Sequence, residues 1–568
     1  MNSTLPEPIA SAGFTTEQKE YLLGIFAGTV VRGQHFGDAQ PSPKPAEDLI
    51  FEERVKRELH PLDAYEQLVE NAIGNKAPDK EEIFRFKWNG LFFLTPVKDA
   101  FMARLRIPGG AVKTYQLREL ARIAQELTTG YVQITTRANL QIRLIQPKDA
   151  PEFLRRVQSV GLHTRGAGAD NIRNLTANPT AGFDPVELID VMPLLNELAA
   201  TIINDRSFYD LPRKFNIAYD GGGLIGSVED TNDVGVKAVK HGDEILFRIA
   251  LGGATGHKAF ARDLGVAVPP AEINKVVLAI VRVYLERGCR TDRKKARLKH
   301  LLEQLPLPDY LAAVEQKLGK TLRREPLAAA QLRWASQELP HSHVGDFPQK
   351  QRGLNYVGVA VPVGQLTPKQ MLRLAELAES YGSGEIRLTV WQNFIIPNVT
   401  DAFVPTLKRA LEKMGLGTRQ SNIASGVIAC TGNRFCKFAQ SDTKAHALEL
   451  TKFLEKRLEL DQPVNIHLTG CPNSCAQHYM GDIGCLGTKT KISGESVDAY
   501  HVFVGGGFGK NQAVGRQIFS GVTGKQLPET LERMLRAYLK HRLPHESFQQ
   551  FTTRHDVGQL QQIFDVAA

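Results

Sequence analysis

The chain has 568 residues, of which 42% are hydrophobic and 23% are charged, as in an ordinary globular protein of two to four domains. No apolar run is long enough to cross a membrane. The net charge of +9 is spread along the chain, with no basic block interleaved with aromatic residues, so an acidic small molecule or an acidic protein is a better partner than nucleic acid. Six cysteines without a recognisable leader predict free thiols in a reducing cytoplasm.

The first 80 residues have the pattern of a helical segment, with apolar residues at helical spacing over residues 17–26. Beyond it, the chain resembles itself. Residues 106–162 align with residues 360–416 without a gap. A gapless match of this length favours an internal duplication over chance similarity between two α/β units.

Each copy begins with a short strand and a turn rich in proline and glycine. A helix with apolar residues at helical spacing follows, then two strands with alternating apolar positions, then a second helix. The expected helices are 116–127 and 370–379, and the expected strands are 131–135, 140–144, 386–390 and 394–397. This order predicts an α+β fold in which a split α/β sandwich is used twice.

Four of the six cysteines form two pairs, Cys430 with Cys436 and Cys471 with Cys475. Four thiolates from two short segments can enclose a [4Fe–4S] cluster. The first pair is spaced too widely for a zinc knuckle, and the closely spaced cysteine run of bacterial ferredoxins is absent. A cluster is therefore favoured, with zinc and buried structural thiols as the alternatives. The other two cysteines are expected to be small core residues.

Four segments together resemble the nitrite and sulfite reductases that contain siroheme and a [4Fe–4S] cluster. They are Arg104-Leu-Arg-Ile-Pro-Gly-Gly, Thr135-Thr-Arg-Ala-Asn-Leu-Gln, Leu211-Pro-Arg-Lys-Phe-Asn, and the two cysteine motifs. The resemblance implies two pseudo-symmetric halves with both cofactors between them. The implied segments are an N-terminal helical segment 1–80, ferredoxin-like half-domains 97–165 and 350–418, a siroheme-binding domain 166–340, a domain for the cluster and siroheme 419–545, and a tail 546–568.

The resemblance also assigns the cofactor ligands. Cys430, Cys436, Cys471 and Cys475 would hold the cluster, and Cys475 would also bridge to the siroheme iron. Siroheme carries eight carboxylates, so its pocket needs arginine, lysine and amide donors. The residues that resemble such contacts are Arg137, Gln141, Arg293, Arg297 and Lys299. For the last three, a solvated helix face is the alternative.

Arg104, Arg173, Lys214 and Asn216 resemble the residues that face the substrate in this family. An oxyanion held on iron needs positive charge and protons from such residues. Lys214 suits proton donation better than the arginines, whose pKa is too high. Lys214 and Asn216 would share a face if residues 211–216 form a strand. For Arg104 and Arg173, an ordinary surface ion pair is the alternative.

Asn216 favours nitrite as the substrate, because sulfite-reducing members usually carry a second lysine there. The resemblance thus implies an assimilatory nitrite reductase that makes ammonia with six electrons. No flavin or nicotinamide fingerprint is present, so reduced ferredoxin is the expected donor, with flavodoxin as the alternative. A sulfite reductase and a non-catalytic iron–sulfur protein are the competing functions. The family is mostly monomeric, and the charge distribution and apolar runs favour neither nucleic acid nor a membrane as a partner.

Overall fold

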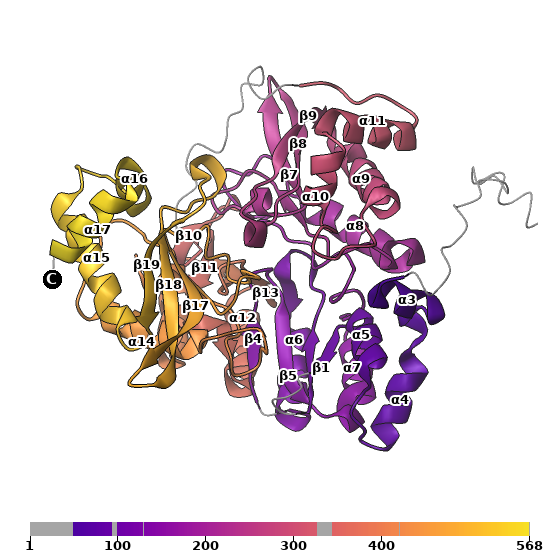
Figure 1. Cartoon of the computed structure of the whole chain (residues 1–568), viewed down its shortest axis with the longest axis horizontal. Coiled ribbons are helices and arrows are strands. Elements are labelled where there is room, and N and C mark those ends of the chain that lie inside the picture. The colour runs from indigo at the N-terminus through magenta and orange to yellow at the C-terminus, as the bar shows by residue number, and fades with distance from the viewer. Residues whose placement is uncertain (1–48, 94–98, 129, 326–342, 420, 567–568) are drawn as a thin grey trace, which may run out of the picture. The chain divides into compact units, whose positions relative to one another are not determined.

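The computed structural model describes residues 49–93, 99–128, 130–325, 343–419 and 421–566 (Figure 1). The chain divides into two compact units, Met1–Arg54 and Val55–Ala568, and the functional residues all lie in the second. The helix expected at residues 17–26 lies outside the described residues. Described helices of the N-terminal region are α3 (Phe51–Glu58), α4 (Tyr65–Ile73) and α5 (Lys80–Arg85).

Both repeats fold in the predicted order of strand, helix, two strands and helix (Figure 1). The first repeat contains β2 (Phe101–Arg104), β3 (Ala111–Lys113), α6 (Thr114–Glu126), β4 (Val132–Ile134), β5 (Leu140–Ile145) and α7 (Ala150–Ser159). The second contains β11 (Leu354–Val359), β12 (Gln365–Leu366), α12 (Pro368–Tyr381), β13 (Glu385–Leu388), β14 (Phe394–Thr400) and α13 (Val404–Lys413). Apolar faces from both repeats meet in one core, in which Leu120 of α6 and Leu374 of α12 are fully buried.

The two repeats exchange a strand. β12 of the second repeat forms the edge of the first sheet, whose order is β1-β2-β5-β4-β12, and its Leu366 pairs with Val132. In return, β3 forms the edge of the second sheet, β10-β11-β14-β13-β3, and its Val112 pairs with Ile386. β1 (Leu91–Phe93) and β10 (Gly345–Pro348) occupy the opposite edges. Because each sheet needs a strand from the other repeat, the half-domains are interlocked.

The Pro/Gly turn of each repeat is the point where the chain crosses to the other repeat. Gly110 and Gly364 have φ angles of 71° and 68°. A Cβ on Gly110 would lie 2.6 Å from the carbonyl oxygen of Leu388, and one on Gly364 would lie 2.9 Å from that of Ile134. Glycine is needed at both places because the turn combines positive φ with close approach to the other repeat's backbone.

The first large domain is a four-stranded sheet with helices that supply its core. Its strands β6 (Ile217–Asp220), β7 (Val234–His241), β8 (Glu244–Leu251) and β9 (Arg262–Val268) lie in chain order, with β6 and β7 parallel. The helices are α8 (Met192–Asn204), α9 (Ile273–Arg287), α10 (Leu298–Gln304) and α11 (Leu307–Leu318). Figure 1 shows these helices gathered at the same end of the unit as the strands.

The second large domain has a five-stranded sheet with the order β15-β16-β17-β18-β19. Its strands are β15 (Val427–Ala429), β16 (Ile466–Thr469), β17 (Ile483–Ile492), β18 (Glu495–Val504) and β19 (Arg516–Thr523), and its helices are α14 (Thr443–Glu455), α15 (Leu527–His541), α16 (Phe548–Arg554) and α17 (Val557–Val566). Residues 546–568 were expected to form a tail. They instead form α16 and α17, because Phe548, Phe551 and Phe564 are buried in this domain's core.

The duplication extends into the large domains. The Phe215 N–H donates to the carbonyl of Asn171 at 3.0 Å, and the Val464 N–H donates to the carbonyl of Asn422 at 2.9 Å. In both domains, this contact precedes a pair of parallel strands, β6 with β7 and β16 with β17. The similarity between residues 171–173 and 422–424 therefore marks equivalent structural positions.

Candidate cofactor and substrate site

The two cysteine motifs follow neighbouring parallel strands. Cys430 comes directly after β15, and Cys471 comes two residues after β16. Parallel neighbours end at the same edge of a sheet, where ligands of α/β proteins usually bind. A Cβ on Gly470 would lie 2.6 Å from Cβ of Ala439 and 3.6 Å from Sγ of Cys430, so this glycine lets the motifs approach each other.

The structure brings the four predicted ligand cysteines together. The Gly470 N–H donates to Sγ of Cys430 at 3.1 Å. Burial raises the pKa of Cys475 to about 11, and the charges of Cys430, Cys471 and Cys436 add to the rise. Burial also raises the pKa of Cys471, with Cys436 and Cys430 raising it further. All four thiols therefore lie within range of one another's charge.

The number and the kind of these ligands fit a cluster. In the described parts of the chain, no three His, Cys, Asp or Glu side chains are close enough to hold a single metal ion. A four-iron cube holds its cysteines further apart than a single zinc ion does, because the sulfurs bind different corners of the cube. The four mutually interacting thiols suit that wider arrangement.

Three cations, Arg104, Arg137 and Lys214, interact with the charge of Cys475, and Arg173 lies near Arg104. Burial lowers the pKa of Arg173 well below its usual value, and the charge of Arg104 lowers it further. Burial and a neighbouring arginine lower the pKa of Lys214 to about 7, whereas the charge of Cys475 raises it. Burial lowers the pKa of Arg137 to about 10, and the charges of Asp233 and, more weakly, Cys475 raise it. We call Arg104, Arg137, Arg173 and Lys214 the cation group.

The two arginines that resemble substrate contacts are held by backbone carbonyls. Arg104 donates to the carbonyl of Ala167 at 3.3 Å, and its guanidinium lies 4.7 Å from the ring centre of Phe92. Arg173 donates to the carbonyls of Ala167 at 2.6 Å and Ala169 at 2.7 Å. Neither arginine forms an ion pair with a described carboxylate, so the expectation of ordinary surface ion pairs does not hold here.

The cation group fits a ligand with many carboxylates. Arg137 donates to Oδ1 of Asn232 at 2.8 Å, a neutral partner. Lys214 has neither a hydrogen bond nor an ion pair to any residue in the described ranges. Cys475 keeps an exposed surface although it lies among these charges, so it borders an opening and not the packed core. Among the described residues none of these cations forms a direct ion pair with a carboxylate, and such positive charge around an opening matches the eight carboxylates of siroheme.

Three other expected siroheme contacts have carboxylate partners within the chain. They are Arg293 with Asp170 at 2.8 Å, Arg297 with Asp233 at 2.8 Å, and Lys299 with Glu303 at 2.6 Å. Asp170 and Asp233 are fully buried, and they lie 123 and 64 residues from their arginines, so sequence spacing gave no sign of them. The ion pair of Lys299 with Glu303 on α10 is largely solvated, which fits the alternative interpretation of an exposed helix face. Gln141 accepts a hydrogen bond from Arg143 at 2.7 Å.

Residues 211–216 do not form a strand, so the condition under which Lys214 and Asn216 would share a face is not met. β6 begins after them, and Phe215 alone makes a bridge to a neighbouring segment. The Phe215 ring packs against Tyr284 in the core, with ring centres 5.0 Å apart. Lys214 is partly exposed, whereas Asn216 is buried. Oδ1 of Asn216 is buried and has no hydrogen-bond partner among the described residues.

An aspartate supports each half of the duplicated site. The Asn216 N–H donates to Oδ2 of Asp233 at 2.9 Å, and the Asn465 N–H donates to Oδ2 of Asp482 at 2.7 Å. Asp233 also binds Arg297, whereas Asp482 has no ion pair with any described residue. Burial raises the pKa of Asp482 to about 7. At equivalent positions, Asp233 of the first half therefore forms an ion pair with Arg297, whereas Asp482 of the second half forms none with the described residues.

The loop that contains Cys475 is anchored to the first half. Thr136 donates through Oγ1 to the carbonyl of Cys475 at 2.9 Å. Gln477 donates through Nε2 to Oγ1 of Thr231 at 3.2 Å. Thr136 lies in a segment that carries the family resemblance, but the sequence gave no reason to single it out.

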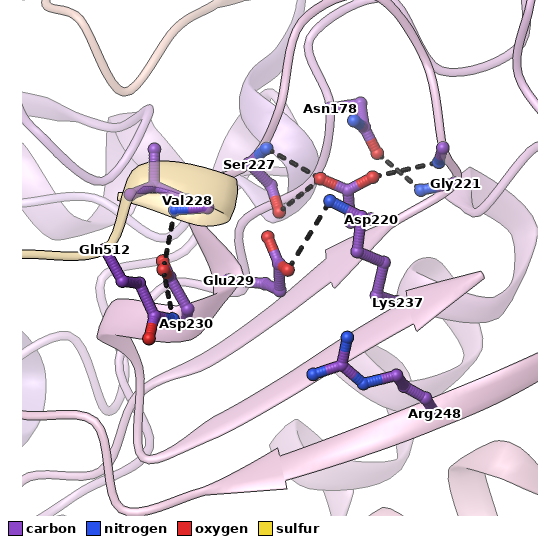
Figure 2. A network of polar contacts seen from close by, with 12 residues as sticks. Asn178, Asp220, Gly221, Ser227, Val228, Glu229, Asp230, Lys237, Arg248 and Gln512 are labelled. Carbon is purple, nitrogen blue, oxygen red and sulfur yellow. Dashed lines mark hydrogen bonds and ion pairs between the residues drawn. The ribbon is translucent and has the colours of Figure 1, made fainter. Parts of the chain in front are cut away.

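A second polar network fastens the halves on the side of the glycine-rich turn after β18 (Figure 2). Oδ2 of Asp230 accepts hydrogen bonds from the Gly509 N–H at 2.8 Å and from Nε2 of Gln512 at 2.7 Å. Glu229 and Lys237 lie beside it as an ion pair at 3.6 Å. This turn therefore has a structural role, in keeping with its lack of a nucleotide-binding fingerprint.

Two family descriptions match most of the chain. "Nitrite and sulphite reductase 4Fe-4S domain" matches residues 168–322 and 422–564. "Nitrite/Sulfite reductase ferredoxin-like half domain" matches residues 96–160 and 347–414. The double match of each description follows the duplication seen in the sequence and in the sheets.

The chain is similar to several characterised proteins over nearly its whole length. It is 36% identical to a ferredoxin–nitrite reductase of Synechococcus elongatus, over 85% of this chain and 95% of the relative. It is 32% identical to "Sulfite reductase [ferredoxin] 1" of Mycolicibacterium paratuberculosis, over 90% of this chain and 96% of the relative. The solved structure of the Mycobacterium tuberculosis NirA protein superposes with a TM-score of 0.83 at 31% identity, over 90% of this chain and 97% of that chain.

These matches confirm the predicted α+β fold with duplicated ferredoxin-like units. They also confirm the predicted cofactors, siroheme and a [4Fe–4S] cluster, which belong to this family. Among the described residues, no helix combines the length and apolar character that a membrane span requires.

Proposed function

Because this chain belongs to the nitrite and sulphite reductase family, we propose that it is an assimilatory ferredoxin-dependent nitrite reductase. The reaction takes nitrite, six electrons and eight protons to ammonium and two water molecules. When bound, siroheme supplies the iron that holds the substrate, and the [4Fe–4S] cluster supplies the electrons. The observation that carries the proposal is the cation group: three of its members interact with Cys475, and none forms an ion pair with a carboxylate of the described residues.

In this proposal Cys430, Cys436, Cys471 and Cys475 bind the cluster as thiolates. Cys475 would also help to hold siroheme when that cofactor is bound. This assignment is supported by the charges around it, because Cys475 interacts with Arg104, Arg137 and Lys214. The hydrogen bond from Thr136 then fixes the Cys475 loop against the half that carries these cations.

Arg104, Arg173 and Lys214 bind nitrite, and Asn216 completes the substrate face. An anion about 4 Å from one cation gains roughly 4 kcal/mol at an effective dielectric near 20, before desolvation is counted. Two or three such cations suffice to hold a singly charged anion in a site that is partly removed from water. The unpartnered Oδ1 of Asn216 leaves this side chain able to bond the substrate or a water.

Lys214 donates protons to the departing oxygen atoms. Burial lowers the pKa of Lys214 to about 7, so the ammonium can release a proton and regain one near neutral pH. The neighbouring arginines keep their protons there and serve as fixed charges. Lys214 thus combines a binding charge with a transferable proton.

The other predicted cofactor contacts divide into two kinds. Arg137 has a neutral partner in the chain, so it binds siroheme carboxylates directly. Arg293, Arg297 and Gln141 have charged or polar partners of their own and position the pocket wall. Lys299 contributes charge at the solvated rim.

Purified enzyme tests this function most simply. Absorption spectra should show the bands of a tetrapyrrole, which a lone cluster lacks. Assays with reduced ferredoxin should show that nitrite is reduced to ammonia faster than sulfite is reduced to sulfide. If the spectra show a cluster but no tetrapyrrole, or if neither nitrite nor sulfite is reduced, the protein would instead be a non-catalytic iron–sulfur protein.

A ferredoxin-dependent sulfite reductase is the second candidate. It is favoured by the 32% identity to a sulfite reductase over 90% of this chain. Asn216 decides against it here, because an amide in place of a second lysine leaves less positive charge for a doubly charged anion. The same pair of assays separates the two candidates.

The donor and the setting complete the proposal. The net charge of +9 suits an acidic ferredoxin steered in by long-range charge, with flavodoxin as the alternative donor. We place the enzyme in the cytoplasm as a monomer, with neither nucleic acid nor membrane as a partner.

A further inference from the structure

Arg143 lies behind the first cysteine motif. It is on β5, and only 3% of it is exposed. Its guanidinium donates to Oε1 of Gln133 at 2.8 Å, to Oε1 of Gln141 at 2.7 Å and to Oγ1 of Thr431 at 2.7 Å. Thr431 directly follows Cys430. An arginine of the first repeat therefore contacts the cluster-binding segment of the second half.

Arg143 has no carboxylate partner within the described ranges. Besides its three neutral hydrogen-bond partners, it faces the ring of Phe435, whose centre lies 5.5 Å from Cζ. Burial lowers the pKa of Arg143 to about 10, and the charges of Tyr131, Cys436 and Cys430 raise it. The guanidinium remains charged at neutral pH, and the cysteine thiolates are its negative neighbours. A buried charge of this kind is costly unless an opposite charge balances it.

Lys444 is a second buried cation at the same motif. It lies in the first turn of α14, is 7% exposed, and donates through Nζ to the carbonyls of Val363 at 2.5 Å and Ala429 at 3.1 Å. Ala429 directly precedes Cys430. Burial lowers the pKa of Lys444 to about 7, and the charge of Cys430 raises it. No described carboxylate forms an ion pair with it.

A backbone N–H and a helix N-terminus add partial positive charge near Sγ of Cys430. The Gly470 N–H donates to Sγ of Cys430, and Thr443, the first residue of α14, lies 3.6 Å from that sulfur through Oγ1. The positive end of the helix dipole is thus near Cys430. Net charge around a cluster and hydrogen bonds to its sulfurs are the factors that set its reduction potential.

We propose that Arg143 and Lys444 raise the reduction potential of the [4Fe–4S] cluster by supplying positive charge on its Cys430 side. The inference rests on the cluster of the proposed function and goes beyond it, since neither residue is a ligand or a substrate contact. When reduced ferredoxin gives up one electron, the donor is oxidised and the cluster becomes more negative by one charge. Nearby cations stabilise that state, so they favour electron uptake. Both are positioning residues for electron entry.

The test is the midpoint potential of the cluster in purified holoenzyme, measured by electron paramagnetic resonance during a redox titration. Arg143→Gln and Lys444→Met should each shift the equilibrium for cluster reduction at least tenfold toward the oxidised form. For a one-electron couple, this is a midpoint lower by about 59 mV or more. Arg143→Lys keeps the charge, so its equilibrium constant for cluster reduction should stay within about threefold of the wild-type value. Iron and siroheme contents are measured on every variant.

Arg156→Gln is the matched control. Arg156 lies in the same half-domain and is also largely buried, but it pairs with Glu119 and Glu126 at 2.6 Å each. Its removal should leave the cluster potential unchanged. If Arg143→Gln loses the cluster, Arg143→Lys and Lys444→Met still decide the question.

Three results would overturn the inference. The first is a wild-type potential in Arg143→Gln and Lys444→Met at full iron content. The second is an Arg143→Lys potential as low as that of Arg143→Gln, which would assign the effect to hydrogen-bond geometry. The third is loss of siroheme from Arg143→Gln with an unchanged cluster potential, which would assign Arg143 to the tetrapyrrole. A wild-type protein without any reducible cluster would instead refute the proposed function, so the two failures are distinguishable.

Discussion

Asp233→Asn should destabilise the protein far more than Asp482→Asn, although the duplication places the two aspartates at equivalent positions. Each accepts the backbone N–H of an asparagine, at 2.9 Å and 2.7 Å. Asp233 is fully buried and binds Arg297, whose side chain is 7% exposed. Asp482 keeps a partly exposed surface and has no ion pair with a described residue. The two substitutions therefore differ in one interaction.

The expected magnitudes follow from that interaction. Removing one partner of a buried ion pair costs about 3–5 kcal/mol, because the other charge stays buried and uncompensated. In Asp482→Asn, the amide oxygen still accepts the Asn465 N–H, and burial raises the pKa of Asp482 to about 7, so the carboxyl is already part neutral at pH 7. Its replacement should be neutral or slightly stabilising at pH 7, because the variant avoids burying a carboxylate.

Urea unfolding at pH 7, followed by tryptophan fluorescence on samples of equal cofactor content, measures both effects. The double variant Asp233→Asn, Arg297→Met is the internal check, because removing both charges should recover much of the loss. Equal effects of the two single substitutions, or no recovery in the double variant, would refute the reasoning.

Three further predictions concern function and pH. Asn216→Lys should raise the ratio of sulfite to nitrite turnover, since it adds a cation for a doubly charged anion; an unchanged ratio removes Asn216 as the selector. Thr136→Val deletes the hydrogen bond to the Cys475 carbonyl, worth about 1 kcal/mol, and should lower nitrite turnover roughly fivefold at full cofactor content; wild-type turnover would contradict the anchoring role. Burial raises the pKa of Asp482 from 3.8 to about 7, so the folded state binds this proton more tightly than the unfolded state does. The contribution of Asp482 to the free energy of unfolding is therefore full below about pH 4 and is lost as the pH rises to about 7. The free energy of unfolding of Asp482→Asn should not show this pH-dependent loss, which is roughly 2–4 kcal/mol in the wild type. Parallel pH profiles of the wild type and the variant would contradict this prediction.

Local patterns in the sequence predicted the repeats and the meeting of the cysteine motifs. Apolar spacing is a property of neighbouring residues, so α6 and α12 could be placed from sequence. The cysteines meet because each cysteine motif follows one of two neighbouring parallel strands, β15 and β16, which end at the same edge of the sheet. The resemblance supplied the cation group, which the structure does gather beside Cys475.

Pairings between distant segments could not be predicted. The exchanged strands β3 and β12 have three and two residues, too short to carry a pattern, and their partners lie in the other repeat. The ion pair of Asp233 with Arg297 spans 64 residues, and charge alone does not identify such partners. Whether residues 211–216 form a strand was left open by the sequence, and in the structure only Phe215 is bridged there.

The central claim is that Cys475 joins the cluster to the siroheme iron beside the cation group. Mössbauer spectra of enzyme enriched in iron-57 test it directly, because a shared sulfur couples the magnetism of the two centres. The account predicts coupled spectra in the wild type and uncoupled spectra in Cys475→Ala variants that keep siroheme. Independent spectra in the wild-type holoenzyme, or coupling that survives in Cys475→Ala, would contradict it.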